Sequence, residues 1–497
     1  MKRVTKGSAV ALSAVVTTAG SLAGIAGTSA AAQGAKVTIN AVLPNGTGSI
    51  TSQENAGLAS LTKSYEAAHR NVTVNWIPNT ASDITSSNAA LVTEASGGAA
   101  PDLVWEQYAA TTALPSGLLQ DLKPWLDKPN PYVAGNKSWL SLFSPSTIPY
   151  MTSTNGGIYI VLGSDVETGM FYNKADFSKA GISSAPATWA QFVADLAKLK
   201  SSGVTPLLFA DGGSCNPSWY ERLVTSSLLQ DRVKSFDVND APVATALDLA
   251  VGIHEGIISM SNPAYAEVWK LLGQLSPYLY SGGSSYDACS EPSAASPPLN
   301  PESLLVQGKV AVEWGGSWWI PQLAQAGFSA KYGVFPEPTI TKQSTPYALG
   351  TVTTGLIGGP NGPGQWSVTS EKADRSMTAA KTAVVINFLA WLFTPQHLGY
   401  FINVLGSGAD IPTETASPTA ALPSLKTLLP SKSVPVVVLP LTTGLLEPSS
   451  ADAAVRLMQE YISSSVSYNQ FSSQWQSLLT TSAEQWASQN HVNLAKY

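Results

Sequence analysis

The residues of this sequence that could perform catalytic chemistry are a few carboxylates. Hydrolysis of a glycosidic bond needs two carboxyl groups that face each other, and no sequence motif identifies such a pair. The candidates are Glu106, Asp165, Glu221 and Glu313. A secreted glycoside hydrolase is therefore kept as an alternative function.

Motifs for other kinds of catalysis are absent from the sequence. The four histidines, His69, His254, His397 and His491, have no spacing typical of a metal site. The sequence has no G-x-S-x-G elbow, no GxxxxGK[ST] loop and no G-x-G-x-x-G after a strand. We therefore expect no metal, no cofactor and no enzymatic activity.

A different chemistry, stacking on aromatic rings, is indicated by QGKVAVEWGGSWWIPQL, residues 307–323. The pattern predicts a helix from Pro301 to Gly308, a strand over 309–314 and a second helix capped by Ser317. Three tryptophans thus flank a strand-to-helix junction. In open α/β sheets this edge is where ligands bind.

Composition excludes one class of partner. Only 12% of the 497 residues are charged, about half the usual ~25%. The net charge is −6 and there are no basic runs, so we expect no nucleic-acid partner. A chain of this length predicts at least two domains.

The N-terminus predicts export. Lys2, Arg3 and Lys6 precede an apolar run of small residues. The small residues at positions 28–33 are of the kind that signal peptidase cleaves. Residues 1–32 are therefore predicted to be a signal peptide. An uncleaved membrane anchor is the alternative, although the run is rich in Gly, Ser and Thr. Export makes Cys215 and Cys289 a candidate disulfide, with two unpaired thiols as the alternative.

The order of the predicted elements indicates the fold class. Strand patterns at 36–42, 72–77 and 101–105 alternate with helical patterns near 58–65 and 82–95. A second alternating block follows 156–157, with a capping box at Thr188 and Gln191. Alternation of this kind predicts α/β architecture with parallel sheets covered by helices on both faces.

Four segments, taken in chain order, carry a family resemblance. They are APDLV (100–104) with GLLQDL (117–122), GGIYIVLGSDVETGMFYNKADFSKAGISSAPATWAQFVADLAKL (156–199), GKVAVEWGGSW (308–318), and 350–357 followed by the helix from Met377. Together they resemble the family 1 extracellular solute-binding proteins of ABC importers, the maltose-binding-protein-like group. Two departures are Gly163, where the family has a proline, and the missing cysteine for lipid attachment after the signal.

The resemblance implies a two-lobed periplasmic binding protein, type II-like, with hinge crossovers between α/β lobes and a ligand held in the cleft. It implies lobe 1 at 36–157 and 341–408, and lobe 2 at 158–340 and 409–497. The protein would be a periplasmic or extracellular monomer, without a lipid anchor at an N-terminal cysteine. It would deliver its solute to the transmembrane permease subunits of an ABC transporter.

A sugar or oligosaccharide is the ligand that the resemblance and the composition favour, because sugars need flat aromatic rings and convergent hydrogen-bonding groups. By analogy with the family, Trp318 is expected at the ligand and Trp319 in the core. Gly316 would allow close backbone approach. The residues expected at the ligand are Trp105, Glu106, Gln107, Tyr108, Asp165, Trp219, Tyr220, Glu313, Gly316 and Trp318.

Several of these assignments have an alternative. Trp105 could equally be a core residue, Asp165 a turn cap and Glu313 a solvated edge residue. Either Trp219 or Tyr220 could supply the second aromatic ring. A polyamine or another polar solute is the alternative ligand, since it would use the same rings with carboxylates.

Overall fold

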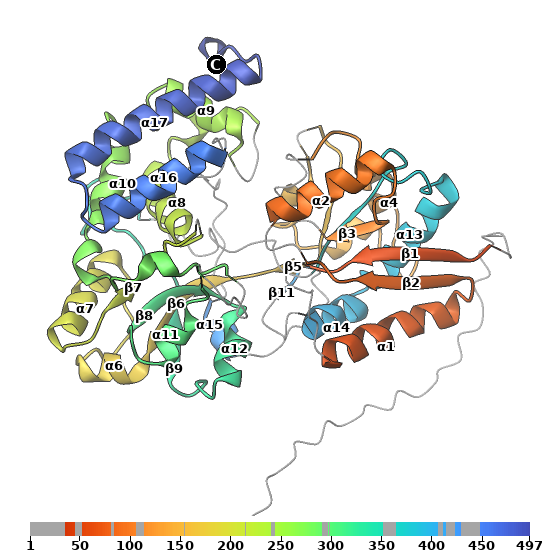
Figure 1. Ribbon diagram of the computed structural model, residues 1–497, viewed down its shortest axis with the longest axis horizontal. Coiled ribbons are helices and arrows are strands. Elements are labelled where there is room, and N and C mark those ends of the chain that lie inside the picture. Colours follow the sequence, from red (N-terminus) through yellow and green to blue (C-terminus); the bar gives the residue numbers. More distant parts are fainter. Residues whose placement is uncertain are drawn as a thin grey trace, which may run out of the picture.

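The computed structural model describes residues 35–44, 52–80, 84–105, 114–153, 155–213, 215–239, 244–290, 297, 299–350, 364–405, 411–413, 423–428 and 448–497. It is an α/β protein of two lobes, each built around its own sheet (Figure 1).

The first lobe contains a five-stranded sheet in the order β2-β1-β3-β10-β4. Strands β1 (Val37–Val42), β2 (Val72–Ile77) and β3 (Leu103–Trp105) are parallel, as the sequence predicts. Strand β10 (Gln365–Val368) runs antiparallel to β3 and to β4 (Val161–Leu162). The predicted parallel pairing thus holds for β1, β2 and β3, and the sheet as a whole is mixed because the chain returns from the second lobe to insert β10 in the opposite direction.

Helices cover both faces of this sheet. On one face pack Leu58, Leu61 and Tyr65 of α1 (Ser52–Ala68) together with α13 (Ala379–Leu392) and α14 (Pro395–Leu405). On the other face lie Leu91 and Ala95 of α2 (Ile84–Gly97). Figure 1 shows α2 and α14 on opposite sides of β1 and β2. Two short helices complete the lobe, α4 (Lys123–Leu126) and α5 (Ile148–Met151).

A buried ion pair holds the sheet to α13. Asp102, which has no exposed surface, lies 2.5 Å from Lys381 Nζ and accepts a hydrogen bond of 2.9 Å from the Asn40 N–H. Lys381 also lies 3.5 Å from Asp374. The aspartate of the APDLV segment thus connects β1, β3 and α13, because a buried carboxylate needs both a counter-charge and hydrogen bonds.

The second lobe contains a four-stranded sheet in the order β7-β8-β6-β9. Strand β6 (Thr168–Asn173) is antiparallel to β8 (Val312–Gly316) and β9 (Tyr332–Phe335), whereas β7 (Leu207–Leu208) is parallel to β8. This sheet too is mixed. The helices of the lobe are α6 (Lys174–Lys179), α7 (Trp189–Ser201), α8 (Cys215–Leu229), α9 (Ala246–His254), α10 (Pro263–Gly273), α11 (Glu302–Val306), α12 (Trp319–Gln325), α15 (Pro423–Leu428), α16 (Pro448–Ile462) and α17 (Tyr468–Gln489).

Local signals in the sequence set several of these boundaries. Thr188 and Gln191 form the predicted capping box of α7. Asn300 Oδ1 accepts a 3.2 Å hydrogen bond from the Glu302 N–H at the start of α11, and Gly308 adopts the positive φ of +66° that ends that segment. Ser317 does not cap α12, which begins at Trp319 without a side-chain cap, because its hydroxyl accepts a hydrogen bond from Glu167 instead.

The C-terminal helices belong to the core of the second lobe. Trp475 of α17 packs on Trp269 of α10, with ring centroids 4.4 Å apart, and its indole N–H donates to the Tyr265 hydroxyl at 2.8 Å. Aromatic pairs of this kind contribute stability beyond their buried area. The chain therefore crosses between the lobes more than once, ending in the second lobe.

A small two-stranded sheet lies where the chain crosses. Strand β5 (Ser164–Asp165) pairs antiparallel with β11 (Ile411–Pro412), and Figure 1 shows β5 extended between the lobes. Gly163 precedes β5 and donates a hydrogen bond to Gly364 O at 2.6 Å. A Cβ at Gly163 would lie 2.5 Å from that oxygen, so this close approach of two strands requires a glycine.

The hydrophobic cores indicate which lobe each flanking residue packs in. Ile158, Ile160 and Leu162 belong to the core of the first lobe. Ile340 and Ala348 belong to the core of the second lobe. We therefore place the crossings slightly later than residues 157 and 340, and these lobe boundaries remain predictions.

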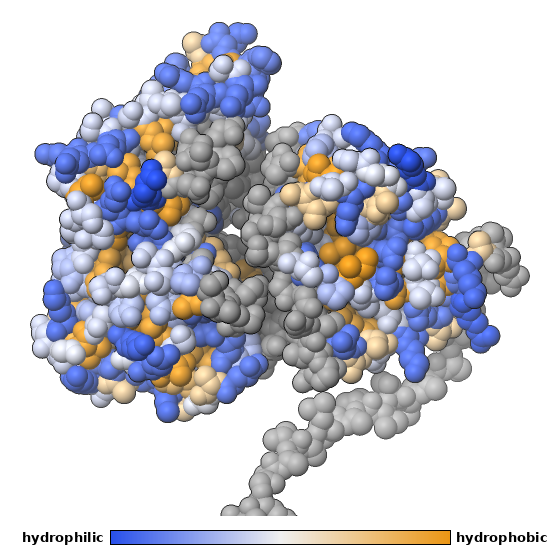
Figure 2. All heavy atoms as spheres, in the orientation of Figure 1, coloured by the Kyte–Doolittle hydropathy of each residue, from blue (hydrophilic) through white to orange (hydrophobic). Residues whose placement is uncertain are grey.

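The surface of the described residues is mixed in character. Figure 2 shows hydrophilic residues over much of the face formed by α17, with hydrophobic residues scattered among them on both lobes. Among the described helices, none is both long enough and apolar enough to cross a membrane.

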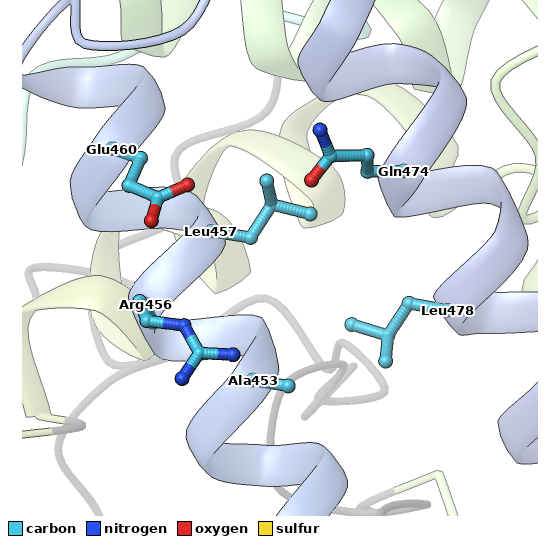
Figure 3. A pocket seen from close by; sticks show the side chains of 6 residues that line it. All are labelled: Ala453, Arg456, Leu457, Glu460, Gln474 and Leu478. Atoms are coloured by element: carbon cyan, nitrogen blue, oxygen red, sulfur yellow. The ribbon is translucent and has the colours of Figure 1, made fainter.

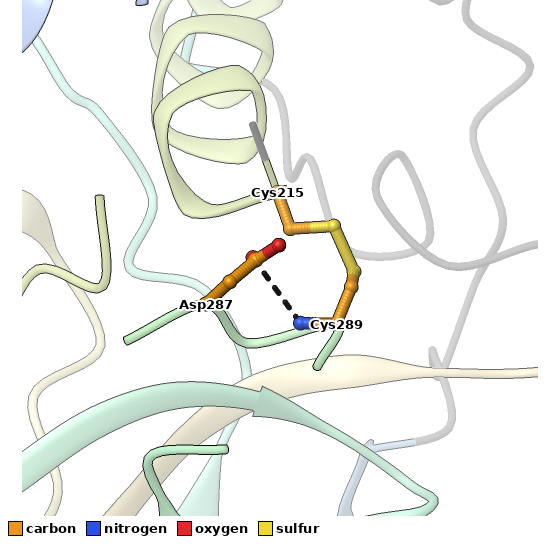
Figure 4. A group of neighbouring side chains, drawn as sticks. All are labelled: Cys215, Asp287 and Cys289. Carbon is orange, nitrogen blue, oxygen red and sulfur yellow. Dashed lines mark hydrogen bonds between the residues drawn. A yellow bond between two sulfur atoms is a disulfide. The ribbon is translucent and has the colours of Figure 1, made fainter. Parts of the chain in front are cut away.

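The two cysteines are joined. Cys215, at the start of α8, forms a disulfide with Cys289, with Cα atoms 6.1 Å apart. Asp287 lies beside the bond and accepts a 3.3 Å hydrogen bond from the Cys289 N–H (Figure 4). The predicted pairing is confirmed, and it holds the first turn of α8 to the loop before α11.

Replacing both cysteines with serine should lower the free energy of unfolding by about 4 kcal/mol, because the bond closes a loop of 74 residues in the unfolded chain. Denaturant unfolding with and without reductant measures the effect. Reductant should destabilise the unchanged protein and leave the double variant unaffected. Equal midpoints for the two proteins without reductant would contradict the prediction.

Candidate functional site

The tryptophan turn, residues 314–319, sits at the carboxyl end of β8. Trp314 and Trp319 are completely buried, on opposite sides of the turn, while Trp318 is half-buried. Trp314 packs edge-to-face on Tyr220 of α8, and Trp319 packs on Phe171 of β6. Trp319 is thus a core residue, as expected, and Trp318 is the member of the three that reaches solvent.

The two glycines of the turn make room for the rings. A Cβ at Gly315 would lie 2.1 Å from the Trp319 ring, and one at Gly316 would lie 2.0 Å from the Trp318 ring. Both distances are far shorter than van der Waals contact. We expected a ligand to approach the Gly316 backbone closely. In the structure the Trp318 ring itself packs on this backbone.

Trp318 and Trp219 form an aromatic corner. Their rings meet edge-to-face with centroids 6.1 Å apart, and Trp219 also contacts Trp314 at 5.9 Å. Trp219 is 7% exposed. Of the two candidates on α8, Trp219 is therefore the one that lies beside Trp318.

Hydrogen bonds tie this corner to the chain crossing. The Ser317 N–H donates to Glu167 O at 2.7 Å, and the Glu167 N–H donates to Ser317 Oγ at 3.4 Å. Thr168 pairs with Gly316 in the β6–β8 ladder. Since Asp165 of β5 lies two residues before Glu167, the aromatic corner is at the end of the second sheet where the chain crosses to the first lobe.

Three carboxyls gather at this end of the sheet, and we call Asp165, Glu167 and Glu337 the hinge carboxyls. Thr168 Oγ1 donates to Glu337 Oε1 at 2.7 Å. Burial raises the pKa of Asp165 to about 7, and burial together with the charges of Glu337 and Asp165 raises the pKa of Glu167 to about 8. Burial also raises the pKa of Glu337 to about 7, against the opposing effect of its hydrogen bond from Thr168 and of the nearby Trp314 indole.

Two of the predicted ligand residues are fully enclosed in the second lobe. Tyr220 has no exposed surface, stacks on Phe209, and its burial raises the pKa of the phenol. Glu313 is 1% exposed, so it is not a solvated edge residue. Burial, with the nearby charge of Glu302 on α11, raises the pKa of Glu313 well above its usual value. Neither side chain is brought to the aromatic corner, because each faces into packed residues of its own lobe.

The remaining predicted residues lie in or next to the first lobe. Trp105 ends β3, is 4% exposed and belongs to the first-lobe core. Glu106, Gln107 and Tyr108 lie outside the described residues. Their contact with a ligand stays a prediction.

The carboxylates considered for catalysis are separated in the fold. Asp165 lies on β5, Glu221 is fully buried on α8, and Glu313 lies on the side of β8 that meets α11. Of the four candidates, these three are described. They belong to different elements and different packing environments, an arrangement that does not resemble two carboxyl groups facing one bond.

Sequence reasoning missed Glu167, Thr168 and Glu337. Glu167 carried one signal, its position directly before the strand and two residues after Asp165. Glu337 carried none, because it reaches Thr168 across 169 positions of the chain.

Two other features of the second lobe are not part of this site. The ligand atoms of Cys215, Asp287 and Cys289 lie within 4.8 Å of one another, but metals bind cysteine as thiolate and these sulfurs are joined in a disulfide (Figure 4). A groove between α16 and α17 carries none of the predicted ligand residues (Figure 3); its lining is Ala453, Arg456, Leu457, Glu460, Gln474 and Leu478.

Comparison with known families gives one broad match. The sequence profile of the family described as "Bacterial extracellular solute-binding protein" matches residues 60–427, most of the chain. A search of curated protein sequences gave no significant match.

Solved structures share the fold. A "Chitin oligosaccharide binding protein" is 17% identical with a TM-score of 0.60, covering 91% of this chain and all of that one. The solute-binding protein RafE in complex with raffinose is 15% identical with a TM-score of 0.60, covering 90% and 100%. A cyclic α-maltosyl-1,6-maltose binding protein from Arthrobacter globiformis is 15% identical with a TM-score of 0.60, also covering 90% and 100%.

Substituting alanine for each turn glycine should have two different effects. Gly315→Ala should lower the free energy of unfolding by about 1–3 kcal/mol, because the added methyl group meets a core ring that cannot move. Gly316→Ala should cost less, because the half-buried Trp318 ring can turn outward. Denaturant unfolding and tryptophan fluorescence of the two variants measure this; equal destabilisation by both would contradict it.

Stability should fall as the pH rises from 5 to 9. The hinge carboxyls have pKa values that are raised in the folded protein, so the folded state holds their protons more tightly than the unfolded state. This contribution to the free energy of unfolding is fully present below about pH 4, where the carboxyls are protonated in the unfolded chain too. It decreases as the pH rises and is lost once the pH has passed the folded pKa values of about 7 to 8. For Glu337 alone, the decrease in the free energy of unfolding is on the order of 3 kcal/mol.

Denaturant unfolding at pH 5, 7 and 9 tests this expectation. Glu337→Gln should flatten the dependence, since glutamine resembles the protonated acid. Stability that increases steadily from pH 5 to 9 would show that the sign is wrong.

Proposed function

The chain belongs to the family of bacterial extracellular solute-binding proteins, and from that premise we propose that it is the solute receptor of an ABC importer for a sugar or oligosaccharide. The solute is held between the two lobes and delivered to the transmembrane permease subunits. The observation that supports this most directly is the half-exposed Trp318, which meets Trp219 at the chain crossing.

An aromatic corner suits a sugar for a physical reason. The C–H face of a pyranose is apolar and packs on a flat ring, whereas its hydroxyl groups need hydrogen-bonding partners beside that ring. The hinge carboxyls and the Thr168 hydroxyl provide polar groups at the same end of the sheet. When protonated, a carboxyl can both donate and accept, which is what neutral hydroxyl groups require.

The related structures support the class of ligand. Their titles name chitin oligosaccharide, raffinose and cyclic maltosyl-maltose as the solutes of those proteins. With identities of 15–17%, they support a carbohydrate without selecting one. A polyamine would need ionised carboxylates, whereas burial raises the pKa of each hinge carboxyl and so opposes its ionisation.

The family also supports the location and the absence of catalysis. We propose that residues 1–32 are a signal peptide, that the mature monomer acts outside the cytoplasmic membrane, and that the solute is returned unchanged. N-terminal sequencing of the exported protein tests the first point. Chromatography of a bound oligosaccharide after long incubation tests the last, because cleavage above background would favour a hydrolase.

Binding of neutral sugars is the central test, and Trp318→Ala should weaken it by about 2 kcal/mol or more, as for a central stacking residue. Calorimetric titration with raffinose, maltotriose and chitotriose, with spermidine as the cationic alternative, measures the affinity. The unliganded stability of the variant should stay close to that of the unchanged protein, since the ring is only half-buried.

Trp486→Ala is the matched control. Trp486 is also half-buried, but it lies on α17, so its loss should leave affinity unchanged. Normal affinity with a strongly lowered unfolding midpoint in Trp318→Ala would place this ring in the core. Binding of spermidine but of no sugar would overturn the carbohydrate assignment.

A further inference from the structure

The hinge carboxyls come from two of the segments that leave the second sheet. Asp165 and Glu167 lie on the segment that enters β6, and Asp165 pairs with Ile411 of β11. Glu337 lies on the segment that leaves β9, two residues after Phe335. Thr168 joins the two segments by donating to Glu337 at 2.7 Å. Acidic side chains thus meet beside β5, the segment on which the chain crosses between the lobes.

Within the described part of the chain, no basic side chain neutralises these carboxyls. None of the three lies within 4.0 Å of a Lys or Arg nitrogen. The charges that act on Glu167 are those of Glu337 and Asp165, both negative. Glu337 faces the Thr168 hydroxyl and the Trp314 indole, and the residues of β11 opposite β5 are Ile411 and Pro412.

A bound metal ion is also disfavoured by the geometry. A chelating site needs ligand atoms that converge. Among the described residues, the three hinge carboxyls do not form a group whose oxygen atoms all lie within 4.8 Å of one another. Glu167 and Glu337 are 9% and 4% exposed, so bulk water does not solvate them well either. For Glu167 and Glu337, a proton on the carboxyl is therefore the remaining way to lower the cost of a buried charge.

The backbone connects these carboxyls to the aromatic corner. Glu167 both donates to and accepts from Ser317, and Ser317 directly precedes Trp318. A shift of Glu167 therefore moves the turn that carries the proposed stacking ring. Water that entered to solvate an ionised Glu167 would have to separate these same segments.

We propose that the hinge carboxyls couple solute binding to proton uptake, so that affinity for a neutral sugar is high in acid and falls as the carboxyls ionise. The proposal rests on the proposed function, since it concerns the same site. A sugar that fills the space beside Trp318 excludes water from the crossing, and this makes ionised carboxyls costlier in the bound state than in the free state. Binding must then take up protons, and by linkage a rise in pH must weaken it.

The ionisation range supports a physiological role for this coupling. The pKa values of about 7 for Asp165 and Glu337 and about 8 for Glu167 place the change between pH 6 and 9. If sugar binding raises the pKa of one hinge carboxyl by one unit, the affinity differs tenfold between the pH at which the carboxyl is protonated and the pH at which it is ionised. The receptor would thus capture sugar best in an acidic medium.

Calorimetric titration from pH 5 to 9 with whichever of raffinose, maltotriose and chitotriose binds best tests the proposal. These sugars do not titrate in this range, so any dependence on pH belongs to the protein. We expect the dissociation constant to rise at least tenfold from pH 6 to pH 9. Titration at pH 7.5 in buffers of different ionisation enthalpy should show protons taken up on binding.

Variants identify the groups responsible. Glu167→Gln and Glu337→Gln, which resemble the protonated acids, should each fold, bind and weaken the dependence on pH, and the double variant should weaken it most. Glu302→Gln is the matched control, because burial raises the pKa of Glu302 to about 7 as well but it lies on α11, beside Glu313. It should keep the full dependence on pH.

The outcomes separate the two proposals. Sugar binding that is independent of pH, or a dependence that Glu302→Gln removes as completely as Glu167→Gln does, overturns the coupling and leaves the receptor function intact. Tighter binding at higher pH overturns it too, since that is the sign expected for ionised carboxylates as ligands. Absence of sugar binding at every pH overturns the proposed function, and the coupling with it.

Discussion

The antiparallel register of β6 on β8 is the constraint on which the candidate site depends. It places Thr168 opposite Gly316, and the two hydrogen bonds between Glu167 and Ser317 continue the pairing beyond the sheet. A shift of one residue would turn every side chain of β8 to the other face, so Trp314 would leave the α8 side. Because β6 follows directly on β5, this register also fixes the chain crossing relative to the aromatic corner.

Packing of large rings against glycine sets the shape of that corner. Gly315 and Gly316 leave space that Trp319 and Trp318 fill from opposite sides of the turn. One ring is thereby committed to the core and the other is held at the surface by the backbone beneath it.

The charge distribution of the molecule fits the same picture. Few residues are charged, yet several carboxyls are buried in the second lobe, at the hinge and beneath α11. Within the described residues these acids form no ion pair with a Lys or Arg, and a proton lowers the cost of burying each carboxyl. The buried Asp102 of the first lobe differs because Lys381 and the Asn40 N–H act to lower its pKa, although burial still leaves that pKa above the usual value.

The sequence by itself determined the features that depend on neighbouring residues. The capping box at Thr188, the start of α11 at Asn300 to Glu302 and the tryptophan turn follow from short patterns, whereas the two-lobed class is implied by the family resemblance of four segments in chain order. The disulfide could be predicted because the chain has two cysteines and an N-terminal sequence that predicts export. Tertiary structure alone decided which side chains meet. Tyr220 and Glu313 face into packed residues, β10 enters the first sheet antiparallel, and Glu337 joins Glu167 at the hinge. Strand order, strand direction and face depend on contacts between residues far apart in the chain, and local periodicity carries no information about them.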